Sequence, residues 1–148
     1  MNKKSKLSPK NNIAAIITIR LNSSRLKNKA LKKINNLTSA QILIKRLKKL
    51  NNISNIILAT SPHKDLSKLR EICEKEKINF FVGSEKKVLK RIILCATKFK
   101  VDSVIRITGD DIFRDIINSD NAILSHKKSN KDITVMKNLP YGLDSQIF

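Results

Sequence analysis

Five short runs of hydrophobic residues lie along the chain, and a segment with helical periodicity separates each run from the next. The runs contain many β-branched residues and little polar alternation, which is typical of strands buried on both faces. They are Ile13–Ile19, Asn55–Thr60, Ile78–Val82, Ser103–Thr108 and Ile133–Met136. Because parallel strands need crossover connections, this alternation predicts a doubly wound α/β fold with a mostly parallel sheet and helices on both faces.

Caps and stripes mark the predicted helices. Thr38-x-x-Gln41 can form a capping box, and Asp115 is placed to cap a shorter helix reaching about Ser125. The hydrophobic stripes are Ile42, Leu43, Leu47 and Leu50, then Leu66, Leu69, Ile72 and Cys73, and then Val88, Leu89, Ile92, Ile93, Ala96 and Phe99. Ligands bind such sheets beyond the carboxyl ends of the strands, where strand order reverses. The loops to inspect follow Ile19, Thr60, Val82 and Thr108.

The length of 148 residues fits one compact domain at 13–148 behind a loose basic arm at 1–12. No hydrophobic run approaches the roughly 20 residues that span a bilayer, so we expect a cytoplasmic protein without a membrane partner. Cys73 and Cys95 fall on helix stripes without a C-x-x-C pair, which indicates buried free thiols. His63 and His126 have no companion ligands and are predicted to lie at the surface.

A net charge of +19 favours anionic partners such as nucleotides, phosphates, RNA or acidic sugars. A biased composition is the alternative explanation of this charge, because lysine accompanies asparagine and isoleucine throughout the chain. No G-x-x-x-x-G-K-[ST] or G-x-G-x-x-G motif is present, which argues against P-loop and dinucleotide-binding classes. Aromatic residues make up only 4%, so stacking platforms for nucleic acid are few. A basic nucleic-acid-binding module remains an alternative through phosphate contacts alone.

The loop after the first predicted strand, Arg20–Lys29, concentrates cations and hydroxyls that could wrap a triphosphate. An ordinary basic surface loop is the alternative. The segment Ile19–Leu31 (IRLNSSRLKNKAL) resembles the signature of the cytidylyltransferases that make CMP-linked acidic sugars, closest to the spore coat polysaccharide biosynthesis protein F branch. The positions that match are Arg20, Ser23, Ser24, Arg25, Leu26, Lys29 and Leu31.

That resemblance implies contacts with the nucleotide and its phosphates for Arg20, Ser23, Arg25 and Lys29, with Arg25 and Lys29 also catalytic. Asn28 stands where the family commonly has glycine. Asparagine is among the least costly non-glycine residues in the left-handed region, so the loop can keep its shape.

Two further blocks resemble the same family. Val82–Arg91 (VGSEKKVLKR) matches G-S-E-x-x-V-L-x-R, which implies that Ser84 and Arg91 face the nucleotide. Arg106–Asp115 (RITGDDIFRD) matches R-I-T-G-D-x-P-x-x-D, which implies that Asp110 is catalytic and holds Mg²⁺ against the triphosphate. Asp111 is either a supplement to this metal site or solvated, and Ile112 replaces the family proline, which predicts a looser loop.

Leu139–Phe148 (LPYGLDSQIF) resembles P-x-G-x-D-x-E-x-F more weakly, with Gln146 in place of glutamate and Asp144 as a sugar contact. The resemblance implies transfer of a cytidylyl group from CTP to an acidic or phosphorylated sugar, giving a CMP- or CDP-sugar and pyrophosphate for surface polysaccharides. Relatives continue past this segment, so we expect a fold that is incomplete at the C-terminus. Two alternatives follow: a truncated protein that binds nucleotide without turnover, or a half-site completed by a homodimer or another chain.

Overall fold

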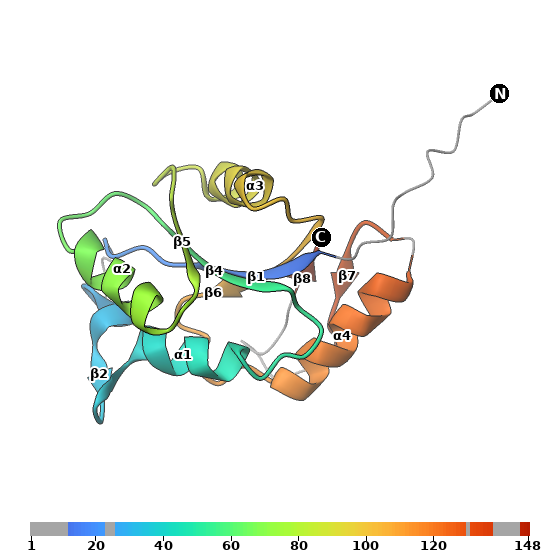
Figure 1. Ribbon diagram of the computed structural model, residues 1–148, viewed down its shortest axis with the longest axis horizontal. Coiled ribbons are helices and arrows are strands. Elements are labelled where there is room, and N and C mark those ends of the chain that lie inside the picture. The colour runs from blue at the N-terminus through green and yellow to red at the C-terminus, as the bar shows by residue number, and fades with distance from the viewer. Residues whose placement is uncertain (1–11, 23–25, 130, 138–145) are drawn as a thin grey trace.

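The computed structural model describes residues 12–22, 26–129, 131–137 and 146–148. Strands and helices alternate along most of it (Figure 1). The strands are β1 (Ile13–Thr18), β2 (Lys33–Ile34), β3 (Leu37–Thr38), β4 (Asn55–Thr60), β5 (Asn79–Val82), β6 (Ser103–Thr108), β7 (Thr134–Val135) and β8 (Gln146–Ile147). The helices are the 3-10 turn η1 (Lys29–Leu31), α1 (Ser39–Leu47), α2 (Leu66–Lys75), α3 (Val88–Lys98) and α4 (Ile116–Lys128). Of the predicted arm 1–12, only Asn12 lies within the described residues.

The main sheet has the strand order β5-β4-β1-β6-β8-β7, and β2 with β3 forms a separate hairpin. β1 pairs in parallel with both β4 and β6, so the predicted mostly parallel sheet is confirmed. The order runs outward from β1 through β4 to β5 and then restarts on the other side of β1 with β6. The reversal therefore lies between β1 and β6, which is where a doubly wound sheet binds ligands.

The last two strands differ from the prediction. The run Ile133–Met136 forms only the two-residue strand β7, and it pairs antiparallel with β8 at the edge of the sheet. The hydrophobic pattern did not predict β8, which pairs antiparallel with β6 as well. A two-residue strand has too few positions to show a period, so only its pairing partner defines it.

Two hydrophobic layers cover the sheet, and alternate residues of β1 point into each (Figure 1). On one face Ile13, Ala15 and Ile17 pack with α1, α2 and α4. On the other face Ala14 and Ile16 pack in a cluster to which α3 is the one described helix that contributes. This division follows from the period of two along a strand, because successive side chains point to opposite faces.

Helix α3 buries a narrower stripe than predicted. Ile92 and Cys95 lie against the sheet, but Leu89 and Ile93 are 62% and 53% exposed. Within the described residues α3 is the one helix that packs on this face, and no second helix covers its flanks, so the prediction that these two side chains are buried is wrong. The thiols of Cys73 and Cys95 are free and buried, as predicted. Burial raises the pKa of Cys73 to about 12 and that of Cys95 to about 11.

His126 is fully buried, so its predicted place at the surface is wrong. Its Nδ1 lies 2.8 Å from Thr134 Oγ1 and its Nε2 lies 3.2 Å from Ser103 Oγ. Two hydroxyls thus satisfy a ring that would be costly to bury without partners. His63 is half-buried, and its Nδ1 accepts from the backbone N–H of Asp65 at 3.1 Å.

Candidate functional site

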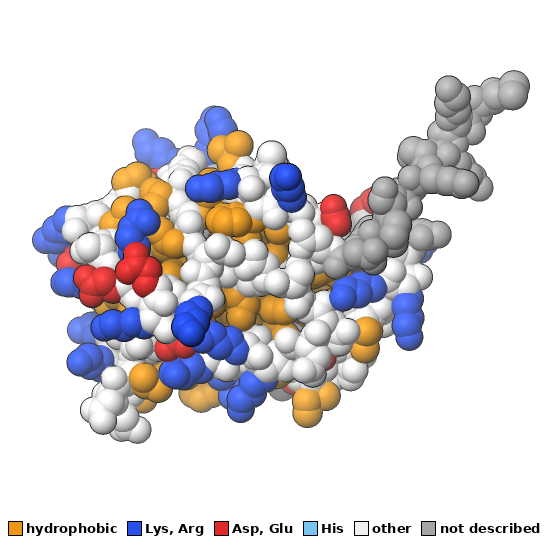
Figure 2. Space-filling model, in the orientation of Figure 1, with side chains coloured by type: hydrophobic (Ala, Val, Ile, Leu, Met, Phe, Trp, Pro, Cys, Tyr) orange, Lys and Arg blue, Asp and Glu red, His pale blue; other side chains and the backbone are white. Residues whose placement is uncertain are grey.

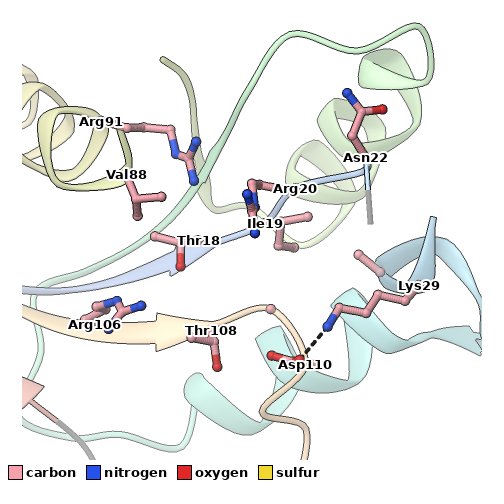
Figure 3. Close-up of a pocket in the computed structure, with 12 residues that line it drawn as sticks. Thr18, Ile19, Arg20, Asn22, Lys29, Val88, Arg91, Arg106, Thr108 and Asp110 are labelled. Atoms are coloured by element: carbon pink, nitrogen blue, oxygen red, sulfur yellow. Dashed lines mark hydrogen bonds and ion pairs between the residues drawn. The ribbon is translucent and has the colours of Figure 1, made fainter. Parts of the chain in front are cut away.

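A pocket of about 370 Å³ opens where the strand order reverses (Figure 3). It lies at the carboxyl ends of β1 and β6, under the first turn of α3. Its lining holds four cationic side chains and the carboxylate of Asp110. The lining residues are Thr18, Ile19, Arg20, Asn22, Lys29, Ala30, Val88, Arg91, Arg106, Thr108, Gly109 and Asp110. Figure 2 shows that Lys and Arg side chains also outnumber Asp and Glu on the face of the molecule drawn there.

The loop after β1 brings Arg20 and Lys29 to this pocket. Asn28 has the left-handed conformation with φ 53° and ψ 30°, as its predicted tolerance of this region allows. Its N–H donates to Leu21 O at 3.3 Å, which closes the loop ahead of η1. Ser23, Ser24 and Arg25 lie outside the described residues, so the roles predicted for Ser23 and Arg25 remain predictions.

Gly109 allows the loop after β6 to pass close to the end of β1. A Cβ at this position would lie 2.4 Å from Ile19 Cγ1 and 3.3 Å from Thr18 O. The N–H of Gly109 donates to Thr18 O at 3.1 Å and so extends the pairing of the two strands beyond their ends. The residue after this glycine is therefore held at the mouth of the pocket.

That residue is Asp110, and its carboxylate forms an ion pair and hydrogen bond with Lys29 Nζ (Figure 3). The bond from Lys29 holds the pKa of Asp110 below its ordinary value of 3.8, although partial burial acts in the other direction. The structure thus brings together Lys29 and Asp110, residues 81 positions apart. Both side chains are partly exposed, at 33% and 54%, so a ligand can reach them.

Arg91 lies at the other end of the pocket, on the first turn of α3, and is 1% exposed. Its Nη1 donates to Ser84 O at 2.6 Å, whereas its buried Nε has no partner among the described residues. Burial, and next the charge of Arg20, lower the pKa of the Arg91 guanidinium. A buried guanidinium with a second guanidinium nearby favours an anion between the two.

Gly83 makes room for the stem of Arg91. A Cβ at position 83 would lie 2.9 Å from both Arg91 Cγ and Phe81 Cε1. Ser84, in contrast, is absent from the pocket lining, and its Oγ accepts from the N–H of Lys87 at 3.1 Å. Its described contribution is the carbonyl that orients Arg91, and the nucleotide contact predicted for its side chain remains a prediction.

Arg106 lines the pocket but was not among the predicted site residues. It shares one face of β6 with Thr108, and both are exposed there, whereas the intervening Ile107 is buried on the other face. A charged residue inside a run predicted to be buried on both faces was the signal that could have identified it. Burying an arginine in such a strand is costly unless its guanidinium reaches a pocket or an oppositely charged partner.

Asp111 supplies neither of the two roles considered from the sequence. Its carboxylate is 7% exposed and forms an ion pair with Arg114, which is 2% exposed. It points away from the pocket lining and into the protein. Asp144, predicted as a sugar contact, lies outside the described residues.

Asp110 is the carboxylate that the lining of this pocket offers to a divalent cation. Within the described part of the chain, no group of three or more His, Cys, Asp and Glu side chains could enclose a metal. Mg²⁺ commonly keeps several waters and takes only one or two carboxylates, with substrate phosphates as further ligands. One accessible carboxylate beside a cationic pocket fits that mode of binding.

The family model for cytidylyltransferases matches residues 14–148. Among curated proteins, an uncharacterized protein of Methanocaldococcus jannaschii is 38% identical over 92% of this chain and 56% of its own length. The spore coat polysaccharide biosynthesis protein SpsF of Bacillus subtilis is 30% identical over 93% of this chain and 59% of its own length. This chain thus spans a little over half the length of these two relatives.

Solved structures share the fold. A cytidylyltransferase from Leptospira borgpetersenii superposes with a TM-score of 0.84 at 23% identity, covering 93% of this chain and 60% of the other. A CMP:2-keto-3-deoxy-manno-octonic acid synthetase complexed with CTP superposes with a TM-score of 0.70 at 16% identity, covering 80% and 48%. No described helix is long and apolar enough to cross a membrane. The family model covers nearly the whole chain and the fold agrees with it, so this chain belongs to the cytidylyltransferase family.

Proposed function

We propose that the pocket binds CTP and that the chain serves cytidylyl transfer to an acidic or phosphorylated sugar. The observation that carries this proposal is the set of four cations around one carboxylate at the strand reversal. The triphosphate of CTP needs several positive charges, and the lining supplies them from three separate segments. A relative named for spore coat polysaccharide biosynthesis supports a product used in surface polysaccharides.

In the proposed reaction a sugar oxygen attacks the α-phosphorus of CTP. A new P–O bond forms, the bond from the α-phosphorus to the oxygen that bridges it to the β-phosphorus breaks, and pyrophosphate leaves. An attacking hydroxyl loses its proton to water and gives a CMP-sugar, whereas an attacking phosphate oxygen has no proton to lose and gives a CDP-sugar. Such a displacement needs positioning and charge neutralisation more than covalent catalysis. Arg20, Lys29 and Arg91 would neutralise phosphate oxygens, and Arg20 is close enough for its charge to lower the pKa of Arg91.

Asp110 would hold Mg²⁺, which would supply further charge neutralisation on the phosphates when bound. Lys29 now occupies the Asp110 carboxylate. A cation that binds this carboxylate would release the Lys29 ammonium, which could then bind a phosphate oxygen. The ion pair thus joins the carboxylate for the metal to a cation for the phosphates. A cytoplasmic location, where CTP is available, belongs to the same proposal.

The test is calorimetric titration of CTP with and without Mg²⁺, followed by pyrophosphate release with acidic and phosphorylated sugars. We expect CTP to bind, Mg²⁺ to strengthen binding, and Asp110→Asn to remove most of the effect of Mg²⁺. CTP binding without pyrophosphate release for any sugar would favour the alternative without turnover. Tight, salt-sensitive RNA binding with no CTP binding would favour the nucleic-acid alternative and overturn the proposal.

A further inference from the structure

One face of helix α1 contacts both loops that carry the Lys29–Asp110 pair. Ser39 and Arg46 are seven residues apart on this helix, which is two turns, so they lie on the same side of it. Ser39 Oγ donates to Lys29 O at 2.8 Å. Arg46 Nη2 donates to Arg114 O at 2.6 Å. Each end of the helix thus binds the backbone of a different loop.

The loop after β6 transmits the second of these contacts to Asp110. It is tightly wound, because the N–H of Asp111 donates to Thr108 O at 3.1 Å and that of Ile112 to Asp110 O at 2.9 Å. The side chains of Asp111 and Arg114 pair inside the protein. Arg114 therefore ties the start of the loop to its end, and Arg46 fixes that end to α1.

Helix α1 is itself held firmly. Its first turn has the full capping box between Thr38 and Gln41, and Leu43, Ile44 and Leu47 are completely buried. Arg46 Nε is buried with no partner among the described residues. Burying Nε without a partner lowers stability. The hydrogen bond from Nη2 to Arg114 O offsets part of this cost and holds the side chain in place.

From these contacts we infer that Ser39 and Arg46 are positioning residues, and that α1 sets the separation of Lys29 and Asp110 by holding both loops at once. The inference rests on the proposed function, because it matters only if this pair receives the metal and the phosphates. It also accounts for a loop that lacks the family proline at Ile112 and is still tightly wound. Contacts to a helix replace the rigidity of the proline ring.

The variants Arg46→Met and Ser39→Ala each remove one contact, and Arg46→Lys restores a cationic donor. Lys45→Met is the matched control, because Lys45 lies next to Arg46 but pairs with Glu76 at 3.6 Å, away from the pocket. Two quantities are measured on the whole chain. Amide hydrogen exchange of Asp111 and Ile112 reports the loop after β6, and free Mn²⁺ counted by electron paramagnetic resonance in the presence of CTP reports the site.

For Arg46→Met we expect faster exchange at both amides and Mn²⁺ affinity with CTP lowered about tenfold, the usual effect of losing a contact behind a metal ligand. CTP affinity without metal should change less than about twofold, Arg46→Lys should recover part of the loss, and Lys45→Met should match the parent. Ser39→Ala should weaken metal-free CTP binding, because Lys29 is the residue it holds.

Mn²⁺ affinity equal to the parent in both Arg46→Met and Ser39→Ala, while the parent binds Mn²⁺ with CTP, would overturn the positioning role alone. Equal losses in Arg46→Met and Lys45→Met would also overturn it, since the effect would then reflect general destabilisation. A parent chain that binds no CTP would overturn the proposed function and the positioning role together.

Discussion

Asn28 Nδ2 donates a hydrogen bond of 3.2 Å to Asp65 Oδ2, which joins the loop after β1 to the loop after β4. The same asparagine has φ 53°. This left-handed backbone conformation costs most L-residues about 1–2 kcal/mol. Glycine would adopt this conformation freely but has no amide to donate. Compared with glycine, asparagine at position 28 has a more strained backbone, but its side chain supplies a hydrogen bond between the two loops.

Substitution of Asn28 separates these two effects. Asn28→Ala loses the bond and increases the backbone strain, so we expect the free energy of unfolding to fall by about 1–2 kcal/mol. Asn28→Gly loses the bond but relieves the strain, and should stay within about 0.5 kcal/mol of the parent. Urea unfolding at neutral pH measures both, and a glycine variant less stable than the alanine variant would contradict this account.

Gly109→Ala should lower the free energy of unfolding by about 1–3 kcal/mol, because its Cβ would meet Ile19 Cγ1 at 2.4 Å. Adding Ile19→Ala removes that atom, so the double variant should be more stable than the sum of the two single effects. A double-mutant cycle by thermal unfolding measures this coupling. Strict additivity would show that the close approach is not what requires glycine here.

Arg91→Met should keep the fold and lose anion binding. Methionine retains most of the buried stem and removes a charged group whose Nε lacks a described partner, so stability should change by less than about 1.5 kcal/mol. CTP affinity should fall at least about tenfold, in line with losing a charged hydrogen bond. Arg70→Met is the control, since Arg70 lies 4.8 Å over the ring of Phe80 and outside the pocket. Calorimetric titration measures the CTP affinity of both variants, and urea unfolding measures their stability. Equal losses of CTP affinity in the two variants would indicate a general charge effect.

Asp115 caps α4, and the N–H of Asn118 that it binds lowers its pKa from the ordinary value of 3.8. A lowered folded pKa stabilises the fold fully above the unfolded value and loses this contribution as pH falls through the folded value. Asp115→Ala should cost about 1 kcal/mol at neutral pH. Asp115→Asn keeps a neutral cap.

The stability difference between the parent and Asp115→Asn should therefore stay constant from about pH 7 to pH 5 and shrink below the ordinary pKa. Urea unfolding across this range, down to about pH 2.5, measures it. A difference that grows in favour of aspartate as the pH falls would contradict the direction of the pKa shift.

Local signals in the sequence predicted the features that depend on neighbouring residues. The capping box of Thr38 and Gln41 and the cap at Asp115 form as expected, because each needs only residues three positions away. The loops after Ile19 and Thr108 were predicted to lie at the ligand-binding end of the sheet, and Lys29 and Asp110 from these loops form an ion pair there. These relationships follow from backbone geometry alone.

Features that depend on distant partners were missed. His126 is buried with Ser119 and Ile123 on one side of α4, a spacing that is visible in the sequence. Its status still depends on hydroxyls from β6 and β7 that no local pattern announces. Likewise Asp111 was considered for the metal site, but its carboxylate is buried in an ion pair with Arg114.

The antiparallel course of β8 has a practical consequence. Phe148 exchanges both backbone hydrogen bonds with Val104, near the start of β6, and Asn12 O accepts from Asp102 N beside it. Asn12 and Phe148 therefore lie beside the residues where β6 begins, at the end of the parallel strands opposite the pocket. Figure 1 shows this arrangement of the strands. A fluorescent label attached at Phe148 therefore lies at the far end of these strands from the pocket, so ligand titrations that use this label should give the same affinities as titrations of the unlabelled chain.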